Sequence, residues 1–418
     1  MRILWFSIVP VNFSNNSNTG GTWIESLQRI VCSWKNSDLG ICYIDRYTET
    51  KHIEGSVTYY PIKIERNFFQ QKWDQYTSKY FDELTLSKCV EVINDFQPDV
   101  IHVFGSEWCF GELVTMTNVP VIIHIQGCMA VINTVKRSIR YSDMDQIRER
   151  FFSPSFYVGN FLRKHRLRER VEREGRVLRN NHYFFVRTRW DSSIVKLFNP
   201  NAQLFFCNEA LRSDFIHEKR KWQPHNRDKI VITTVGAALI KGVDLILKTA
   251  KLLKQNTDLN FEWRLIGGAN KKLSVVSNKM KIEFADVNVI SMGFLSAGQI
   301  VDSLLDSDIY IHPSYIDNSP NSICEAQYLG VPVITTYVGG IPSLFSSEYD
   351  QTMLVGVNDE YYLASKICEL VHDKDAQVQL SKENMRIAYK RHSDDTISES
   401  LRYSYQAVID DTINKNYI

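Results

Sequence analysis

Residues 312–342, HPSYIDNSPNSICEAQYLGVPVITTYVGGIP, decide the fold. They follow the run Asp308–Ile311 and contain the run Val331–Thr336, and short apolar runs bounded by glycine and proline are typical of buried strands. Two such strands with a helix between them form the repeating unit of a parallel sheet covered by helices. The stretch therefore predicts an α/β fold.

The helix between these two strands has well-marked ends. Ser319 is a good N-cap, Pro320 suits the first helical position, and Gly330 suits a left-handed residue after the last turn. Asp317 therefore lies in the loop just before the helix, and Glu325 lies within it. Seven residues separate the two carboxylates.

This arrangement suits a nucleotide-sugar. The free N–H groups at a helix N-terminus favour a phosphate. Asp317, ahead of the helix, suits a sugar hydroxyl or a developing positive charge, and Glu325 suits the two hydroxyls of a ribose. The alternative, from spacing alone, is an ordinary strand, loop and helix with two solvated acids.

The stretch also resembles the E-x7-E signature of glycosyltransferase family 4, within the GT-B superfamily. Asp317 departs from the family pattern, which usually has Glu there. The residues that match are Pro313, Ser314, Pro320, Glu325, Ala326, Gly330, Pro332, Val333, Ile334, Thr336, Gly339 and Gly340. The resemblance implies two doubly wound, Rossmann-like α/β domains facing each other across a cleft.

Composition sets the broad class. A chain of 418 residues predicts two domains, and 44% hydrophobic with 23% charged residues is typical of a globular protein. The net charge of +1 implies no general affinity for nucleic acid. Eight scattered cysteines without a C-x-x-C pair argue against a zinc site and for a reducing compartment. We therefore expect a cytoplasmic protein.

The N-terminal half begins with an apolar strand at 2–9, a polar loop ending at Gly20 and Gly21, and a helix at 22–33. Strand, glycine turn and helix open a nucleotide-type fold, although a tight turn without a ligand gives the same pattern. The family resemblance implies that this loop borders the cleft, near the acceptor and the donor phosphates.

A later strand, VPVIIHIQG at 119–127, ends in polar residues. The family often has a histidine near the transferred sugar where this chain has Gln126, so the resemblance implies that Gln126 meets the sugar through hydrogen bonds. His124 points to the same face of the strand, and we interpret it as a structural histidine.

Residues 136–180 have thirteen Lys and Arg against six acids, which gives 13 − 6 = +7. A basic helix beside aromatic residues suits an anionic membrane surface or a phosphate-linked lipid, and the alternative is a solvated helix face. Peripheral contact with the inner face of the membrane is one expectation from this segment. The pairs Asp143/Asp145 and Asp306/Asp308 are interpreted as solvated loops rather than metal ligands.

The segments FVRTRWD and CNEALR resemble the end of the N-terminal domain in bacterial polysaccharide-building members of family 4. Arg187, Arg189 and Glu209 are candidates to face the cleft, and structural ion pairing is the alternative.

Residues 219–229 are polar and contain a proline, so they predict a linker. The strand, glycine and helix pattern then restarts, which predicts a second domain similar to the first. The expected division is an N-terminal acceptor-binding domain (1–218), a C-terminal nucleotide-sugar-binding domain (225–392) and a last helix (393–418) that crosses back to the N-terminal domain.

The restart contains the expected phosphate contacts. Gly236 ends the strand, and Lys241 opens the next helix, from which it can reach a phosphate; a surface lysine is the alternative. The family usually has an arginine where this chain has Ala237. The diphosphate then depends more on Lys241 and on the helix start at Ser319, Asn321 and Ser322, or on an arginine of the N-terminal domain. The resemblance also implies base contacts from Met292, Gly293 and Phe294.

Together these features predict transfer of a sugar from a nucleotide-sugar to a hydroxyl of an acceptor. The family resemblance implies retention of anomeric configuration, favours a UDP-sugar, and implies a glycan or lipid-linked acceptor in polysaccharide biosynthesis. Catalysis is assigned to Asp317, Glu325, Lys241 and Gln126. We expect neither a metal nor another cofactor, since a lysine and a helix dipole take the place of a cation. The alternatives are an epimerase or phosphorylase on the same architecture, and a non-catalytic donor-binding or scaffold subunit.

Overall fold

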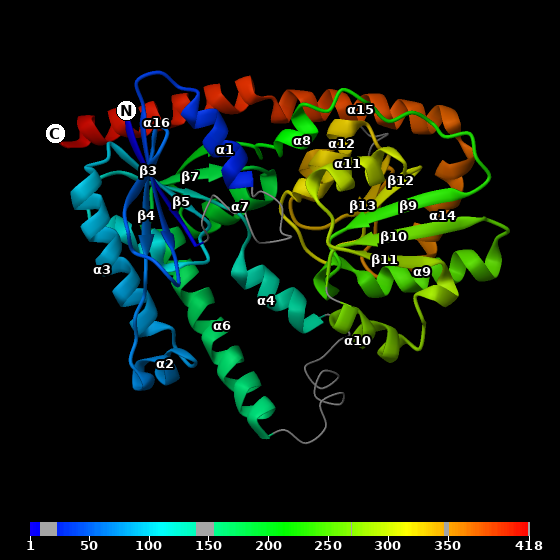
Figure 1. The fold of residues 1–418 in the computed structure, drawn as a ribbon, viewed down its shortest axis with the longest axis horizontal. Coiled ribbons are helices and arrows are strands. Elements are labelled where there is room, and N and C mark those ends of the chain that lie inside the picture. The colour runs from blue at the N-terminus through cyan, green and yellow to red at the C-terminus, as the bar shows by residue number, and fades with distance from the viewer. Residues whose placement is uncertain (9–22, 139–153, 269, 347–350, 417–418) are drawn as a thin grey trace.

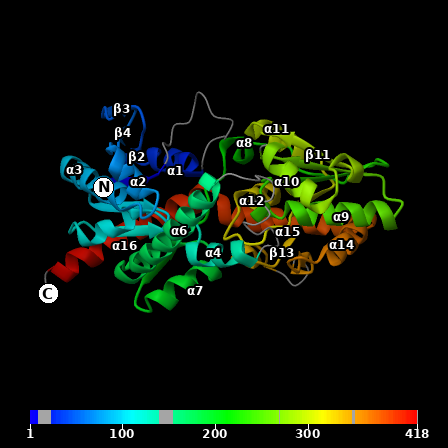
Figure 2. The same ribbon diagram turned by 90° about the horizontal axis from the view of Figure 1, so that it is seen from below.

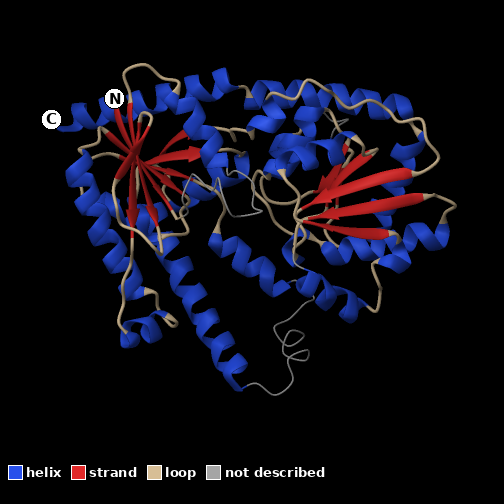
Figure 3. Ribbon diagram, in the orientation of Figure 1, coloured by secondary structure: helices blue, strands red, loops and turns tan. Residues whose placement is uncertain are grey.

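The computed structural model describes residues 1–8, 23–138, 154–268, 270–346 and 351–416. Two separate sheets lie in two halves of the chain, each with helices on its faces (Figure 1, Figure 3). The α/β prediction is therefore confirmed.

The N-terminal sheet has eight strands in the order β3-β4-β2-β1-β5-β6-β7-β8, and each pairing is parallel except β3 with β4. Its strands are short, and all except the edge strands β3 and β8 are almost wholly buried, as expected for a sheet covered on both faces. Their bounds are β1 Arg2–Ser7, β2 Asp38–Ile44, β3 His52–Glu54, β4 Val57–Ile62, β5 Val100–Phe104, β6 Val121–His124, β7 Tyr183–Val186 and β8 Gln203–Phe206.

Helices cover this sheet on both sides, and each side has its own apolar core. The direction in which the chain adds strands to the sheet reverses between β1 and β5, so the loops after these two parallel strands meet at one edge of the sheet. The helices of this half are α1 Trp23–Cys32, α2 Phe68–Asp74, α3 Lys79–Phe96, α4 Met129–Ser138, α6 Pro154–Asn180 and α7 Arg189–Phe198, with a 3₁₀ turn, η1, at Cys109–Thr115. The short helix that follows, α8 Ser213–Ile216, packs against the C-terminal domain.

The C-terminal sheet is parallel throughout, in the order β11-β10-β9-β12-β13-β14. Successive strands run outward from β9 in one direction and from β12 in the other, so the topological switch point lies between them. Ligands of open α/β sheets bind outside the carboxyl ends of the strands at such a point. The bounds are β9 Ile230–Val235, β10 Phe261–Ile266, β11 Val289–Gly293, β12 Ile309–His312, β13 Val333–Thr336 and β14 Leu354–Val355.

The helices around this sheet are α9 Val243–Asn256, α10 Asn270–Met280, α11 Ala297–Leu305, α12 Asn321–Leu329, α14 Glu360–His372 and α15 Lys374–His392. The predicted left-handed stop of α12 is confirmed, since Gly330 has φ +85°. Its predicted start is one residue too early: Pro320 is the N-cap and Asn321 the first helical residue, because Pro320 keeps an extended ψ of 122°.

The predicted helix start at Lys241 is also wrong by two residues. Lys241 ends a short 3₁₀ turn, η2 Leu239–Lys241, and α9 begins at Val243. Between them Gly242 takes a left-handed φ of +78°, and a Cβ atom there would collide with the carbonyl oxygen of Pro313. The glycine therefore lets the loop after β9 lie directly against the loop after β12.

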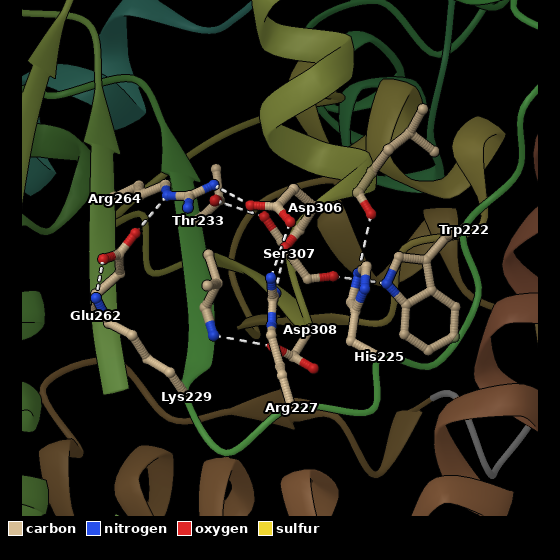
Figure 4. Close-up of polar contacts among 12 residues, drawn as sticks. Trp222, His225, Arg227, Lys229, Thr233, Glu262, Arg264, Asp306, Ser307 and Asp308 are labelled. Carbon is tan, nitrogen blue, oxygen red and sulfur yellow. Dashed lines mark hydrogen bonds and ion pairs between the residues drawn. The ribbon is translucent and has the colours of Figure 1, made fainter. Parts of the chain in front are cut away.

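The segment 219–229 is held firmly against the C-terminal domain (Figure 4). The indole N–H of Trp222 donates to the carbonyl of Ser307 at 2.6 Å, and Arg227 donates to the Asp308 carboxylate at 3.0 Å. The interpretation of Asp308 as solvated is therefore wrong: it is fully buried, because it directly precedes β12 and accepts a hydrogen bond from the Val231 amide of neighbouring β9. Asp306 is half-exposed and pairs with Arg227 and Arg264. Asp143 and Asp145 lie outside the described residues.

The last helix, α16 Asp394–Asn416, lies along the N-terminal sheet (Figure 1, Figure 2). Tyr405 is buried there; it accepts a hydrogen bond from Trp5 at 3.2 Å and lies 2.6 Å from a ring nitrogen of His102. The hydroxyl of Tyr183 donates to Asp411 at 2.6 Å. Among the residues that the structure describes, no helix is long and apolar enough to cross a membrane.

Candidate active site

Two loops meet at the switch point of the C-terminal sheet, one after β9 and one after β12. Gly236 directly follows β9 and has φ +104°. Ala237 is buried against Gly268, where an added Cβ would come within 2.5 Å of the Ala237 carbonyl oxygen. The position where the family usually has an arginine is therefore part of a tight packing contact between two glycine-containing loops.

Lys241 and Asp317 meet across these loops. The Lys241 ammonium donates to Oδ2 of Asp317, and Nε2 of His312 lies 3.0 Å from the same oxygen. Burial alone would raise the pKa of Asp317, but the charge of Lys241 and the contact with His312 bring it down to about 2. Asp317 is therefore ionised at neutral pH, and it partly neutralises the lysine that was assigned to the diphosphate.

His312, the last residue of β12, was not singled out from the sequence. It is buried, and burial lowers its pKa despite the neighbouring Asp317 carboxylate. Neutral at physiological pH, it can donate one hydrogen bond to Asp317 and hold that side chain in place. Its position five residues before Asp317, at the end of a predicted strand, was the available signal.

Glu325 is held by a second residue that the sequence analysis did not single out. Arg212, which immediately precedes α8, donates from Nε to one carboxylate oxygen at 2.7 Å and from a terminal nitrogen to the other at 2.8 Å. Burial raises the pKa of Glu325, and Arg212 opposes that rise. Arg212 is the last residue of the CNEALR segment. The sequence therefore pointed to this segment, but not to the role of Arg212 in orienting Glu325.

The residue after Asp317 connects the two domains. Asn318 donates to Oδ2 of Asp191 at 2.7 Å, and the hydroxyl of Thr188 donates to its side-chain oxygen at 2.6 Å. All three residues are buried, and a Cβ added to Gly340 would lie 2.5 Å from the Thr188 hydroxyl. The position of the Asp317 loop is therefore coupled to the start of α7 in the N-terminal domain.

The remaining candidates lie around these pairs. Gln126 is partly exposed two residues beyond β6, and Ser319 is buried just before α12. Asn321 and Ser322 are half-buried in the first turn of α12, where free amides point out of the helix.

The predicted base contacts lie on β11, at the edge of the C-terminal sheet. Met292 and Phe294 are exposed, and Gly293 has φ +66°, with its carbonyl accepting from the Gly267 amide at 2.6 Å. Gly20 and Gly21 lie outside the described residues.

Of the N-terminal candidates, His124, Arg187 and Glu209 belong to one buried polar chain. Arg187 donates to His124 at 3.2 Å and lies 3.4 Å from Glu209, so it makes the structural ion pair. Burial lowers the pKa of His124 well below its usual value, so it is neutral, as expected of a structural histidine. Arg189, by contrast, is exposed at the start of α7.

Glu209, Cys324 and His392 bring potential metal-ligand atoms within 4.8 Å of one another. The neighbouring charges do not suit a metal, because Arg187 and Arg391 already act on Glu209. A divalent cation would have to approach both guanidinium groups. We therefore assign this cluster to the packing between α12, α15 and the segment before α8.

Glu107, in the loop after β5, is a buried carboxyl that no sequence motif singled out. Its side chain folds back over Gly105, and its Oε2 has no hydrogen-bond partner among the described residues. Burial, with the negative charge of Glu174 nearby, raises the pKa of Glu107 to about 7.

Glu107 should therefore make stability fall as pH rises. Between pH 4.5, the usual pKa of a glutamate, and about 7, the folded state holds a proton that the unfolded chain has lost. Above that range the buried carboxyl is ionised, and this lowers the free energy of unfolding by up to about 3 kcal/mol. Glu107→Gln is expected to flatten this pH dependence and to raise the melting temperature at pH 8. Exposed Glu91→Gln is the matched control, and equal pH profiles for both variants would contradict the prediction.

Residues 215–387 match the family model described as glycosyl transferases group 1. The chain is 29% identical over 195 residues to N,N'-diacetylbacillosaminyl-diphospho-undecaprenol alpha-1,3-N-acetylgalactosaminyltransferase of Campylobacter jejuni, a match that covers 45% of this chain and 47% of that protein. It is 27% identical over 195 residues to the phosphatidylinositol N-acetylglucosaminyltransferase GPI3 subunit of Saccharomyces cerevisiae, covering 45% and 41%. The chain thus spans less than half the length of these curated relatives.

Solved structures cover nearly the whole chain. Sucrose-phosphate synthase from Thermosynechococcus elongatus superimposes with a TM-score of 0.73 at 12% identity, covering 97% of this chain and 98% of that one. HepE from Anabaena, solved in complex with UDP and glucose, gives 0.60 at 13% identity, covering 97% and 99%. These likenesses confirm the predicted GT-B fold.

Proposed function

Residues 215–387 belong to glycosyl transferases group 1, and on that premise we propose that this protein transfers a sugar from a nucleotide-sugar to a hydroxyl of a glycan or lipid-linked acceptor. The observation that carries the proposal is the Lys241–Asp317 pair at the switch point, beside the N-terminus of the helix that contains Glu325. We favour a UDP-sugar, retention of anomeric configuration, and a cytoplasmic role in bacterial polysaccharide biosynthesis.

In this proposal Lys241 and the amides of Ser319, Asn321 and Ser322 receive the diphosphate, since both offer positive charge at one place. Donor binding draws Lys241 toward the phosphates and leaves Asp317 to face the sugar. Gln126 approaches that sugar from the opposite domain.

The reaction then proceeds by positioning and electrostatic support. The bond between the anomeric carbon and the diphosphate oxygen breaks as the acceptor oxygen attacks from the same face, and the acceptor proton goes to the leaving diphosphate. Ionised Asp317 stabilises the positive charge that spreads over the sugar ring, and Lys241 stabilises the negative charge of the leaving group. The proposal needs no metal, because a lysine and a helix dipole supply the positive charge.

The donor site is tested by thermal-shift measurements with UDP, GDP, ADP and a panel of their sugars on the wild type, Glu325→Ala and Glu325→Gln. A ligand at 100 times its Kd stabilises by about 2.7 kcal/mol, which is easily measured. We expect a uridine nucleotide to shift the wild type and to lose most of its effect in both variants. If no nucleotide or nucleotide-sugar changes the melting temperature of the wild type, the proposal is contradicted.

Arg212 should act through the charge of Glu325. In Arg212→Met the buried carboxyl loses its cation, its pKa rises, and at neutral pH more of it is protonated and a poorer acceptor for ribose hydroxyls. UDP binding is therefore expected to weaken severalfold at pH 7 and to recover as the pH is raised toward 9. Arg220→Met, at an exposed arginine nearby, is the control. A loss of affinity independent of pH would indicate a merely structural role for Arg212.

A non-catalytic donor-binding subunit remains the second candidate, because Ala237 stands where the family usually has an arginine. The enzyme and the non-catalytic subunit are distinguished by mixing the protein with its donor and candidate acceptors and measuring UDP release. Binding without release in the presence of each acceptor would favour the second candidate.

A further inference from the structure

Several large aromatic side chains are left in water on one part of the N-terminal domain. On α2, Phe68, Phe69 and Trp73 are 66%, 81% and 53% exposed, and on α6 Phe161 is 64% exposed. Single exposed apolar residues are common on protein surfaces, but a contiguous group of them marks an interaction site.

These four side chains belong to one surface because the turn that directly follows α2 contacts α6. Tyr76, just after α2, stacks on His165 of α6 with ring centres 3.6 Å apart, and a ring nitrogen of His165 lies 3.2 Å from the Tyr76 carbonyl oxygen. Trp73 lies beside Tyr76, at 6.2 Å between ring centres. Phe161 precedes His165 by four residues and so lies on the same face of α6. Figures 1 and 2 both show α2 and α6 close together, and in Figure 1 they project from the same side of the domain.

Positive charge is concentrated at the same place. Residues 164–168 hold three cations and no acid, and Lys164, Arg166 and Arg168 are all exposed. On α2, Lys72 is exposed and lies over the Phe68 ring at 5.5 Å. We call these four cations and the four aromatic residues the aromatic–basic surface. The whole chain carries a net charge of only +1, so this charge is a local feature.

The combination fits one kind of partner. A second copy of this chain would bring like charges together, and a nucleic-acid duplex would cover the cations and leave the phenylalanine rings in water. An anionic bilayer accommodates both the aromatic rings and the cations, because aromatic rings insert at the headgroup level while lysine and arginine side chains extend to the lipid phosphates. We propose that the aromatic–basic surface docks the N-terminal domain on an anionic lipid bilayer.

The surface differs from the one expected from the sequence. That expectation placed membrane contact within 136–180, whereas three of the four exposed aromatic residues come from α2, more than eighty residues before α6 begins. The surface also lies outside the donor site, so vesicle binding does not depend on the proposed enzymatic activity.

The test is flotation of the full chain with phosphatidylcholine vesicles, with and without about a third of phosphatidylglycerol. One variant is Phe68→Ser/Phe69→Ser/Trp73→Ser, and another is Lys164→Glu/Arg166→Glu/Arg168→Glu. The matched control is Tyr337→Ser/Tyr361→Ser, which removes exposed aromatics from the C-terminal domain. Melting temperatures of all variants check that they fold, which is expected because every substituted side chain is exposed.

We expect the wild type and the control to float with anionic vesicles but not with neutral ones. Both test variants should lose binding, the charge variant by a factor on the order of a hundred, since each cation near an anionic surface contributes about fivefold. Failure of the wild type to bind anionic vesicles, equal binding to neutral vesicles, or wild-type binding by either folded test variant would overturn the proposal.

Discussion

Lys241→Met is expected to lower kcat by a factor on the order of 10² to 10³, the usual effect of removing one preorganised donor from a site where charge develops. Lys241 is the cation that the structure places at the switch point, against Asp317 and beside the start of α12. Its contribution should grow as the bond to the diphosphate breaks, so kcat should fall more than donor affinity. Steady-state kinetics with the identified donor and acceptor measure both.

The same substitution also leaves Asp317 without its cation, and a second variant separates the two effects. Asp317 has a pKa of about 2, below its usual 3.8, so its ion pair stabilises the fold above pH 3.8 and is lost as the pH falls through about 2. Lys241→Met/Asp317→Asn removes both charges. If the double variant recovers stability while kcat stays low, the two charges serve catalysis rather than folding; if it also recovers kcat, neither charge acts in the transition state.

The control is Lys251→Met, an exposed lysine on α9. A kcat for Lys241→Met equal to that of Lys251→Met would exclude Lys241 from the transition state.

Asp308→Ala is expected to destabilise the C-terminal domain by about 3–5 kcal/mol, because it leaves Arg227 and the Val231 amide without their common acceptor in a buried place. The loss of Asp308 should also weaken neighbouring ion pairs (Figure 4). Arg227 bridges Asp306 and Asp308, and Asp306 in turn pairs with Arg264 of β10. The cluster joins the segment 219–229 to β9, β10 and the start of β12.

Thermal unfolding measures this effect. In a domain of this size, about 2–4 °C is lost per kcal/mol, so a fall of roughly 6 °C or more is expected. Asp302→Ala is the matched control, since Asp302 is exposed and its pair with Arg220 should contribute less than about 1 kcal/mol. A melting temperature within 2 °C of that control would mean that the cluster contributes little. Arg227→Met/Asp308→Asn should recover part of the loss.

How well a feature of this protein could be predicted depends on how many residues along the chain its cause spans. The strand, helix and glycine pattern at 312–342 was predictable, and Gly330 ended the helix where expected, because periodicity and turn chemistry act within a few residues. The predicted start of α12 was wrong by one residue, and the predicted start of α9, at the loop that contains Gly242, was wrong by two. In the second case the conformation of Gly242 depends on the carbonyl of Pro313, 71 residues away in the sequence.

The sequence by itself thus determined the two α/β domains, the loop that contains Asp317, the helix that contains Glu325, and the glycine turn before Lys241. Only the tertiary structure decided that Lys241 pairs with Asp317, 76 residues away, and that Arg212 orients Glu325 across 113 residues. It also decided that Asp308 is buried and that the turn after α2 meets α6. The physical reason is that a strand or a helix is specified by neighbouring residues, whereas an ion pair exists only once packing has removed two distant side chains from water and set them face to face.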